Sequence, residues 1–143
     1  LLTPLISQEI DHIIKTYKNG QKWYEGNLIE GKVDGLFTFW YRNGQKSYEE
    51  NYKDGIKDGE FTGWYESGKI SSKKYYKNDK RDGEWTTWYE NGQKKTERFY
   101  RDGKVEGLEY YWYESGQKFR ELNYNNNELI SEIKWNEDGS LIE

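Results

Sequence analysis

The chain contains no cysteine, methionine or alanine and only one proline among its 143 residues. Without cysteine it forms neither disulfides nor thiolate metal sites. It also has no run of about 20 apolar residues, which a membrane-spanning helix needs. Aliphatic side chains are scarce, so the aromatic residues, 18% of the chain, must form most of any core. The same aromatic content argues against a disordered chain.

Charge of one sign does not dominate either. Charged residues make up 34% of the chain, but the net charge is only −4. The two signs are therefore mixed, which predicts neither a nucleic-acid groove nor a basic patch for anionic lipid. No starting methionine is present, and the segment 1–6 lacks the basic start of a signal peptide. The missing methionine and cysteine favour an extracytoplasmic or cell-surface location, with the cytoplasm as the alternative.

The sequence is built on an internal repeat of 24 residues. Four series share this interval: Trp40, Trp64, Trp88 and Trp112; the tyrosine after each of them; Gly20, Gly44, Gly68, Gly92 and Gly116; and Gly35, Gly59, Gly83 and Gly107. We expect one continuous repeat domain with an N-terminal cap segment (1–15), five modules (16–135) and a C-terminal half-hairpin cap (136–143).

Each module reads as a β-hairpin. Residues 84–89 are rich in aromatic and β-branched residues, and Asn91-Gly92 then predicts a type I′ turn before a returning strand over 94–100. The other connection, residues 53–59, reads as a longer Gly/Asp loop. Consecutive hairpins then pair edge to edge as an antiparallel meander.

The two-residue periodicity of strands assigns the side chains to faces. If Asn43-Gly44 is a two-residue loop, residue 41 pairs with 46 and 39 with 48, so tryptophans and tyrosines lie on opposite faces. A bulged three-residue turn is the alternative, and it would slip the register by one. We expect an apolar face with Phe37, Phe39, Tyr41, Tyr48, Tyr52, Phe61, Tyr65, Ile70, Trp85, Tyr89, Tyr100, Tyr113 and Leu122. The other face is expected to be solvated and to carry the tryptophan row among Thr38, Thr62, Thr86, Glu25, Glu49, Glu97 and Glu121.

The predicted fold is all-β: a single-layer, twisted and curled antiparallel sheet. No second layer is evident in the sequence. Thr3-Pro4 predicts a short N-terminal helix to about Glu9, followed by a strand from His12. The segment 133–141 reads as a shortened final hairpin.

The segments 88–94 (Trp-Tyr-Glu-Asn-Gly-Gln-Lys) and 100–107 (Tyr-Arg-Asp-Gly-Lys-Val-Glu-Gly) resemble the bacterial variant of the MORN repeat. All five modules fit the pattern. The resemblance implies a single-layer twisted sheet, no catalytic residues, and a role in binding proteins or, for some members, membrane lipid. Bacterial chains of this kind are often labelled antitoxin-like. Thr16 in place of tryptophan, Asp79 in place of glycine and the asparagines at 125–127 depart from the pattern.

Nothing in the residues predicts an enzyme, a cofactor or a metal site. The single histidine, His12, has no catalytic partner pattern, and the repeated Glu25, Glu49, Glu97 and Glu121 read as a solvated ladder rather than a catalytic pair. Lysines and an arginine interrupt the Asp-Gly loops, which lack the acidic spacing of a calcium loop.

The tryptophan row has two interpretations. The rings either cover their own hairpins or form a platform for a ligand, with roughly 9.6 Å between neighbours. Residues that vary at one structural position are free to specify a partner. We therefore predict a partner-binding patch of Trp64, Trp88, Trp112, Tyr75, Phe99 and Phe119, rimmed by Lys73 and Glu97.

We expect a non-enzymatic module that binds or scaffolds another protein through this aromatic face. A cell-surface polysaccharide is the alternative ligand, and peripheral lipid is the weaker third. No nucleic-acid partner is expected. The open edges of the sheet make a homodimer a further possibility.

Overall fold

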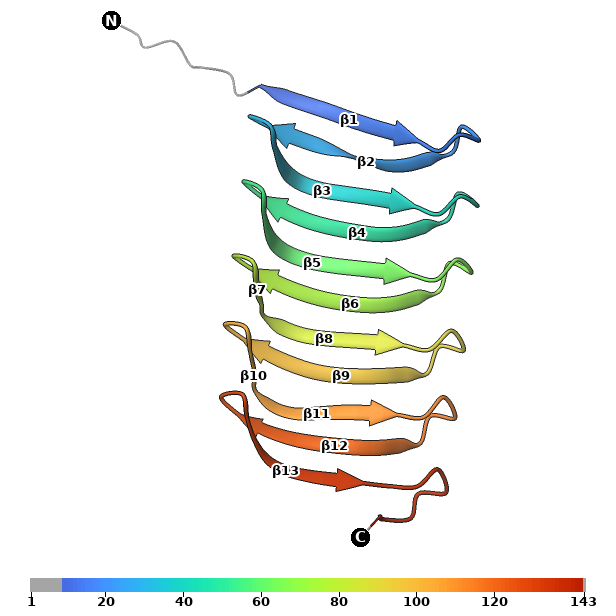
Figure 1. Ribbon diagram of the computed structural model, residues 1–143, viewed down its shortest axis with the longest axis vertical. Helices are drawn as coiled ribbons and strands as arrows, with labels where there is room; N and C mark the ends of the chain where they lie inside the picture. The colour runs from blue at the N-terminus through green and yellow to red at the C-terminus, as the bar shows by residue number, and fades with distance from the viewer. Residues whose placement is uncertain (1–8, 143) are drawn as a thin grey trace, which may run out of the picture.

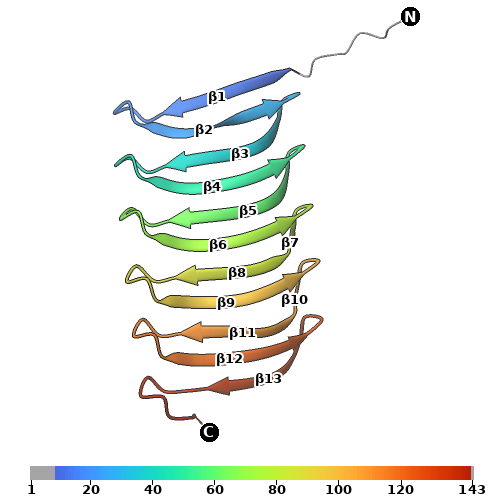
Figure 2. The same cartoon turned by 180° about the vertical axis from the view of Figure 1, so that it is seen from behind.

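The computed structural model describes residues 9–142, which form one antiparallel sheet of 13 strands without a helix (Figures 1 and 2). The strands are β1 (Ile10–Thr16), β2 (Lys22–Ile29), β3 (Lys32–Trp40), β4 (Lys46–Lys53), β5 (Ile56–Trp64), β6 (Ile70–Lys77), β7 (Lys80–Arg81), β8 (Gly83–Trp88), β9 (Lys94–Arg101), β10 (Lys104–Val105), β11 (Gly107–Trp112), β12 (Lys118–Asn125) and β13 (Glu128–Lys134). They follow one another in sequence order as a meander, with β7 paired to β6 and β10 paired to β9. The all-β single-layer prediction is confirmed. No helix that could cross a membrane is found between residues 9 and 142.

The turns that contain Asn-Gly are not type I′, and that prediction is wrong. In the turn after β3, Gly44 N donates to Tyr41 O (3.0 Å) and Tyr41 N donates to Gln45 O (2.8 Å). Gly44 has a φ of 86°, whereas Asn43 keeps a negative φ. A type I turn is therefore followed by a left-handed glycine, which is the three-residue hairpin loop. The Asn43 side chain accepts from Gln45 N and donates to Glu66 O of the next turn.

A β-bulge corrects the register immediately after this turn. Trp40 pairs with Lys46 but Phe39 pairs with Tyr48, so Ser47 is an extra residue on β4. From Phe39 onward the pairing is the predicted one, because the bulge compensates for the longer turn. The same shift recurs in β2, β6, β9 and β12.

The type I′ turns lie at the other connection, which was predicted as a longer loop. Asp54 and Gly55 have φ values of 52° and 86°, and Lys53 pairs with Ile56 across them. Asp and Asn tolerate this conformation because their short side chains bond locally. Gly55 N donates to Val33 O (2.8 Å), and Asp54 N donates to the Asp34 carboxylate (2.8 Å). Each such turn is thereby fastened to the preceding hairpin.

The sheet face that carries the tyrosines following the repeated tryptophans (Tyr41, Tyr65, Tyr89 and Tyr113) is here called the Tyr face. The core lies on this face. Aromatic rings from successive strands between β2 and β9 pack against one another, mostly edge to face, with centroids 4.8–6.4 Å apart, and this series is here called the aromatic stack. The stack consists of Tyr24, Phe37, Tyr52, Phe61, Tyr76, Trp85 and Tyr100. Phe37, Phe61 and Tyr100 are buried. Tyr41 Oη donates to Trp64 O of the next module (2.7 Å), and this bond recurs down the sheet.

An ion pair replaces the aromatic stack where β11 begins. Glu109 stands in the series of Phe61 and Trp85, yet it is buried. Its carboxylate accepts from Arg98 (2.5 Å) and from Tyr111 Oη (2.5 Å). The buried charge is therefore paired and hydrogen-bonded, as burial of a carboxylate requires.

We expect the stability of the fold to fall at alkaline pH because of this cluster. Burial and the hydrogen bond to Glu109 raise the pKa of Tyr111 to about 12, against about 10 in an unfolded chain. A raised pKa stabilises the fold fully below pH ~10 and loses that contribution as the pH rises through ~12. Urea unfolding between pH 9 and 12 should show this loss, and Tyr111→Phe should reduce it. Equal pH dependence of the two proteins would contradict the assignment.

The two ends of the sheet differ. After β13, the segment 135–142 turns back with Asn136 N donating to Ser140 O (2.8 Å) and a bridge between Trp135 and Leu141, as the predicted final hairpin. At the other end, β1 includes the strand expected from His12. The short helix expected before it falls largely on residues 1–8, outside the described residues.

Candidate interaction surface

The tryptophans of the repeat lie in a row on the face opposite the aromatic stack, here called the Trp face. Trp40, Trp64, Trp88 and Trp112 are half-buried rather than freely exposed. A lysine from the preceding module lies over three of the rings: Lys22 over Trp40 (5.3 Å), Lys46 over Trp64 (5.8 Å) and Lys94 over Trp112 (5.8 Å). Cations at this distance from an indole centroid are attracted to the ring. Three of the four rings are thus covered.

Each covering lysine is held by a glutamate three residues later, in the pairs Lys22–Glu25, Lys46–Glu49 and Lys94–Glu97. Lys118, at the same position of the fifth module, pairs with Glu121 in the same way. The hydrogen bond from Lys22 lowers the pKa of the Glu25 carboxyl, which keeps the pair ionised. His12, the only histidine, contacts Glu25 and Asn27 at this end of the face.

The third module breaks the pattern at both positions of the pair. Ile70 occupies the lysine position and Lys73 the glutamate position. Lys73 instead reaches back to Glu60, with 3.6 Å between Nζ and Oε1. Between residues 9 and 142, no lysine or arginine is centred over Trp88. Trp88, half-buried like the others, is therefore the one ring of the row without a cation over it, and it is here called the uncovered ring.

Two neighbouring hollows meet at Trp88. One, of about 380 Å³, is lined by Lys69, Ile70, Lys73, Trp88 and Gly92. The other, of about 240 Å³, is lined by Glu60, Lys73, Tyr75, Glu84, Thr86 and Trp88. The Ile70 and Tyr75 side chains are 40% and 47% exposed, which is high for large apolar groups. The hollows combine an apolar centre with four charged groups at the rim.

Most of the predicted site residues lie on this face. Lys73, Tyr75 and Trp88 share one hollow, and Trp64 and Trp112 flank Trp88 in the row. Thr86 pairs with both Lys73 and Glu97, and Glu84 pairs with Phe99, so the predicted rim crosses β6, β8 and β9. Phe99 is 42% exposed.

Phe119 does not join this patch. It is the bulge residue of β12, and its ring lies 4.8 Å from Tyr113 and 5.8 Å from Tyr111 on the Tyr face. Bulge residues turn to that face because the extra residue shifts the alternation by one. Lys95, the bulge residue of β9, lies over Tyr89 in the same way.

Ile70 was predicted on the apolar face, which is wrong, because it lies on the Trp face beside Trp88. The two-residue turn assumed for the hairpins put it on the apolar face, and the bulge returns it to the Trp face. The signal was nevertheless present, since isoleucine stands where the other modules have lysine and Lys73 stands where they have glutamate. Glu60 and Glu84 were also overlooked.

The described residues show no cluster of three or more His, Asp or Glu side chains suited to a metal ion. The side chains that the Trp face offers to a ligand around Trp88 are aromatic, apolar and charged.

The hairpins from β3 to β12 carry the family signature. The profile of the MORN repeat variant matches four successive segments: residues 33–54, 57–78, 81–102 and 105–126. The chain belongs to the MORN repeat variant family. Repeats of this family are generally non-enzymatic modules that take part in protein interaction or membrane association. No protein with a curated description matches the chain.

Proposed function

We propose that this MORN repeat chain binds another protein through the part of the Trp face around Trp88. The observation that carries the proposal is the substitution of Ile70 and Lys73 for the lysine–glutamate pair of the other modules. Where the pair is present, the indole is covered. Where it is replaced, Trp88, Ile70 and Tyr75 form an open apolar centre.

The composition of this area suits a protein partner. Aromatic residues at the centre with charged groups at the rim are typical of the parts of interfaces that contribute most affinity. Lys73 lies among the carboxylates of Glu60 and Glu84, so the rim has both signs. A mixed rim selects a partner by charge pattern rather than by net charge.

The contacts weigh against a polysaccharide stacked along the whole row. Such a ligand needs successive indole faces open to solvent, but lysines lie over Trp40, Trp64 and Trp112. Of the four rings in the row, Trp88 is the one without a lysine over it within residues 9–142, which fits a local protein contact better than an extended glycan.

Restoring the pair in the third module tests the proposal. We expect Ile70→Lys/Lys73→Glu to fold normally, because both residues occupy these positions in other modules, and to place a lysine over Trp88. Binding of the partner should fall by about tenfold or more, since the apolar centre is covered. The immobilised chain and this variant would be compared for proteins retained from the source cells, followed by calorimetry with the purified partner.

Two control variants make the result specific. Tyr48→Lys changes a residue of the Tyr face that is 48% exposed and should bind the partner as well as wild type. Lys22→Ile/Glu25→Lys opens the row at Trp40, outside the proposed site, and should also bind the partner as well as wild type. A partner retained equally by the Ile70→Lys/Lys73→Glu variant would contradict the proposed site. Recovery of no specific protein by any version would contradict the function.

A further inference from the structure

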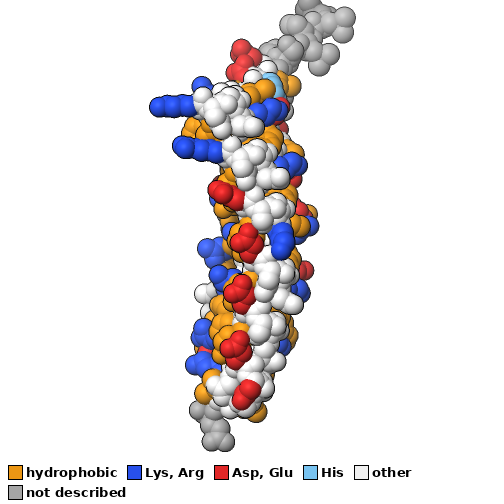
Figure 3. Space-filling model, turned by 90° about the vertical axis from the view of Figure 1, so that its right-hand side faces the viewer, with side chains coloured by type: hydrophobic (Ala, Val, Ile, Leu, Met, Phe, Trp, Pro, Cys, Tyr) orange, Lys and Arg blue, Asp and Glu red, His pale blue; other side chains and the backbone are white. Residues whose placement is uncertain are grey.

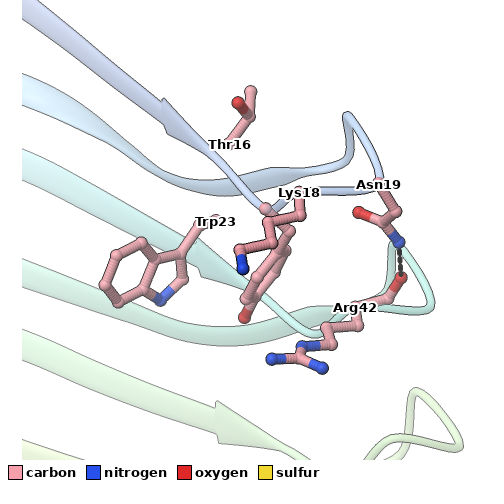
Figure 4. Close-up of a pocket in the computed structure, with 6 residues that line it drawn as sticks. Thr16, Lys18, Asn19, Trp23 and Arg42 are labelled. Carbon is pink, nitrogen blue, oxygen red and sulfur yellow. Dashed lines mark hydrogen bonds between the residues drawn. The ribbon is translucent and has the colours of Figure 1, made fainter.

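Another hollow lies at the first turn of the sheet, away from Trp88. Its volume is about 630 Å³, and it is lined by Thr16, Tyr17, Lys18, Asn19, Trp23 and Arg42 (Figure 4). Two successive turns, 17–21 and 41–45, supply the residues together with the start of β2. Figure 4 shows the Lys18 and Arg42 side chains extending on the same side as the indole of Trp23.

The hollow is made from positions at which the first modules differ from the later ones. Lys18 and Arg42 occupy the turn position that is Glu66, Glu90 and Glu114 further along. The turn edge is consequently basic near the N-terminal end and acidic below it (Figure 3). Trp23 occupies the bulge position that is Ser47 and Ser71 in the next two modules. The repeat does not require Lys18, Arg42 or Trp23, because later modules have other residues at the same positions.

Two of the side chains that line the hollow, Lys18 and Arg42, carry positive charge. Tyr17 Oη is already bonded to Trp40 O (2.7 Å). Asn19 donates to Arg42 O (3.3 Å) and accepts from Gln21 N (3.2 Å). Neither Lys18 nor Arg42 forms an ion pair within residues 9–142, and the Arg42 guanidinium lies 5.6 Å from the Tyr17 ring. The site therefore offers two unpaired cations to a ligand.

Trp23 adds an apolar platform beside these cations. Its side chain is 48% exposed, although its ring contacts Tyr17 (5.9 Å between centroids) and Tyr24 (5.3 Å). The residue equivalent to Trp23 in the next module, Ser47, is small and buried. An exposed indole next to a guanidinium is the kind of residue pair that anchors protein contacts.

We infer that this hollow binds an acidic peptide segment of a partner protein, with carboxylates on Lys18 and Arg42 and an aromatic or aliphatic side chain on Trp23. Two cations without an ion-pair partner within residues 9–142 favour a carboxylate over the hydroxyls of a neutral sugar. A single sheet layer gives one wall, which suits a segment held by further contacts more than an enclosed small molecule. The acidic turns below repel the segment and confine it to this end. The inference does not rest on the proposed function of the Trp face.

Binding of synthetic peptides to the full chain tests the inference. The probes are acetylated, fluorescein-labelled pentapeptides in which Phe, Tyr or Leu is flanked by Asp or Glu, with Asn and Gln versions as neutral controls. We expect anisotropy to show binding of the acidic probes that weakens as salt is raised. Arg42→Glu and Trp23→Ser should each weaken it by about tenfold or more. Both variants carry residues found at the same positions of other modules, so circular dichroism melts should stay close to wild type.

Glu114→Arg is the matched control, since it changes the same turn position far from the hollow and should leave peptide binding intact. Equal affinity for wild type and the Arg42→Glu or Trp23→Ser variants would overturn the inference. So would the absence of binding by any acidic probe up to about 1 mM. Binding of a glucuronate hexasaccharide or of ATP in place of the peptides would overturn the choice of a peptide ligand.

Discussion

Arg98→Ala is expected to lower the free energy of unfolding by about 3–5 kcal/mol, although the arginine side chain is partly exposed to solvent. The reason is Glu109, which is 3% exposed and accepts from Arg98 at 2.5 Å. Without the guanidinium, a carboxylate remains buried beside Tyr111 with no opposite charge. Urea unfolding followed by circular dichroism would measure the loss.

The opposite change should have a much smaller effect. Glu109→Phe removes the buried charge and restores the residue type of Phe61 in the same series, so we expect neutral or raised stability. Arg98, whose side chain is 27% exposed, then reaches water. Arg120→Ala, which removes the exposed pair with Glu132, is a control for loss of an arginine and should cost at most about 1 kcal/mol. Similar losses in Arg98→Ala and Glu109→Phe would contradict the buried-charge argument.

The sequence was sufficient to predict the repeat, the single-layer meander and the two faces of most residues. The interval of 24 identified equivalent positions independently of any detail of the turns. Equivalent positions in a repeat share one environment. The aromatic residues of the series that contain Tyr52 and of the series that contain Phe61 and Trp85 therefore indicated a continuous apolar stripe. The aromatic stack on the Tyr face is that stripe.

Turn chemistry was the step that failed, because Asn-Gly fits more than one turn. Asn-Gly favours type I′ in isolated hairpins, whereas here Asn43 bonds to its own turn and to the next one, and only Gly44 is left-handed. The added bulge at Ser47 then restores the register. The longer turn and the bulge shift the register in opposite directions, so the hydrophobic pattern beyond them is the same as with a two-residue turn.

The predicted face was wrong mainly for the residue between the turn and the bulge and for the bulge residue itself. A shift of one residue moves a side chain to the other face of a sheet. Ile70 therefore moved from the predicted core to the surface beside Trp88, and Phe119 moved from the predicted patch to the Tyr face. The covering of the indoles by Lys22, Lys46 and Lys94 was likewise not foreseen, because these lysines belong to the preceding module.

Phe61→Ala should be the most damaging truncation in the aromatic stack, with an expected loss of about 3–5 kcal/mol. Phe61 is 7% exposed and lies between Tyr52 (5.5 Å) and Tyr76 (4.8 Å), while Lys57 covers its ring. Residues 9–142 form a single layer, so no second layer within this range closes the cavity, and the rings on both sides lose their contact. Chemical unfolding of the purified variant would measure the effect.

The position of the residue in the repeat adds a second expectation. Each hairpin contacts only its neighbours, so stability is close to a sum of module and nearest-neighbour terms. Phe61→Ala should therefore weaken hydrogen-exchange protection first in β4, β5 and β6, and much less in β11 and β12. Tyr48→Ala, an exposed aromatic on the same face, should cost little and leave this protection unchanged. A uniform loss of protection from β1 to β13 would show instead that the sheet opens as one cooperative unit, in which case the modules do not contribute separately.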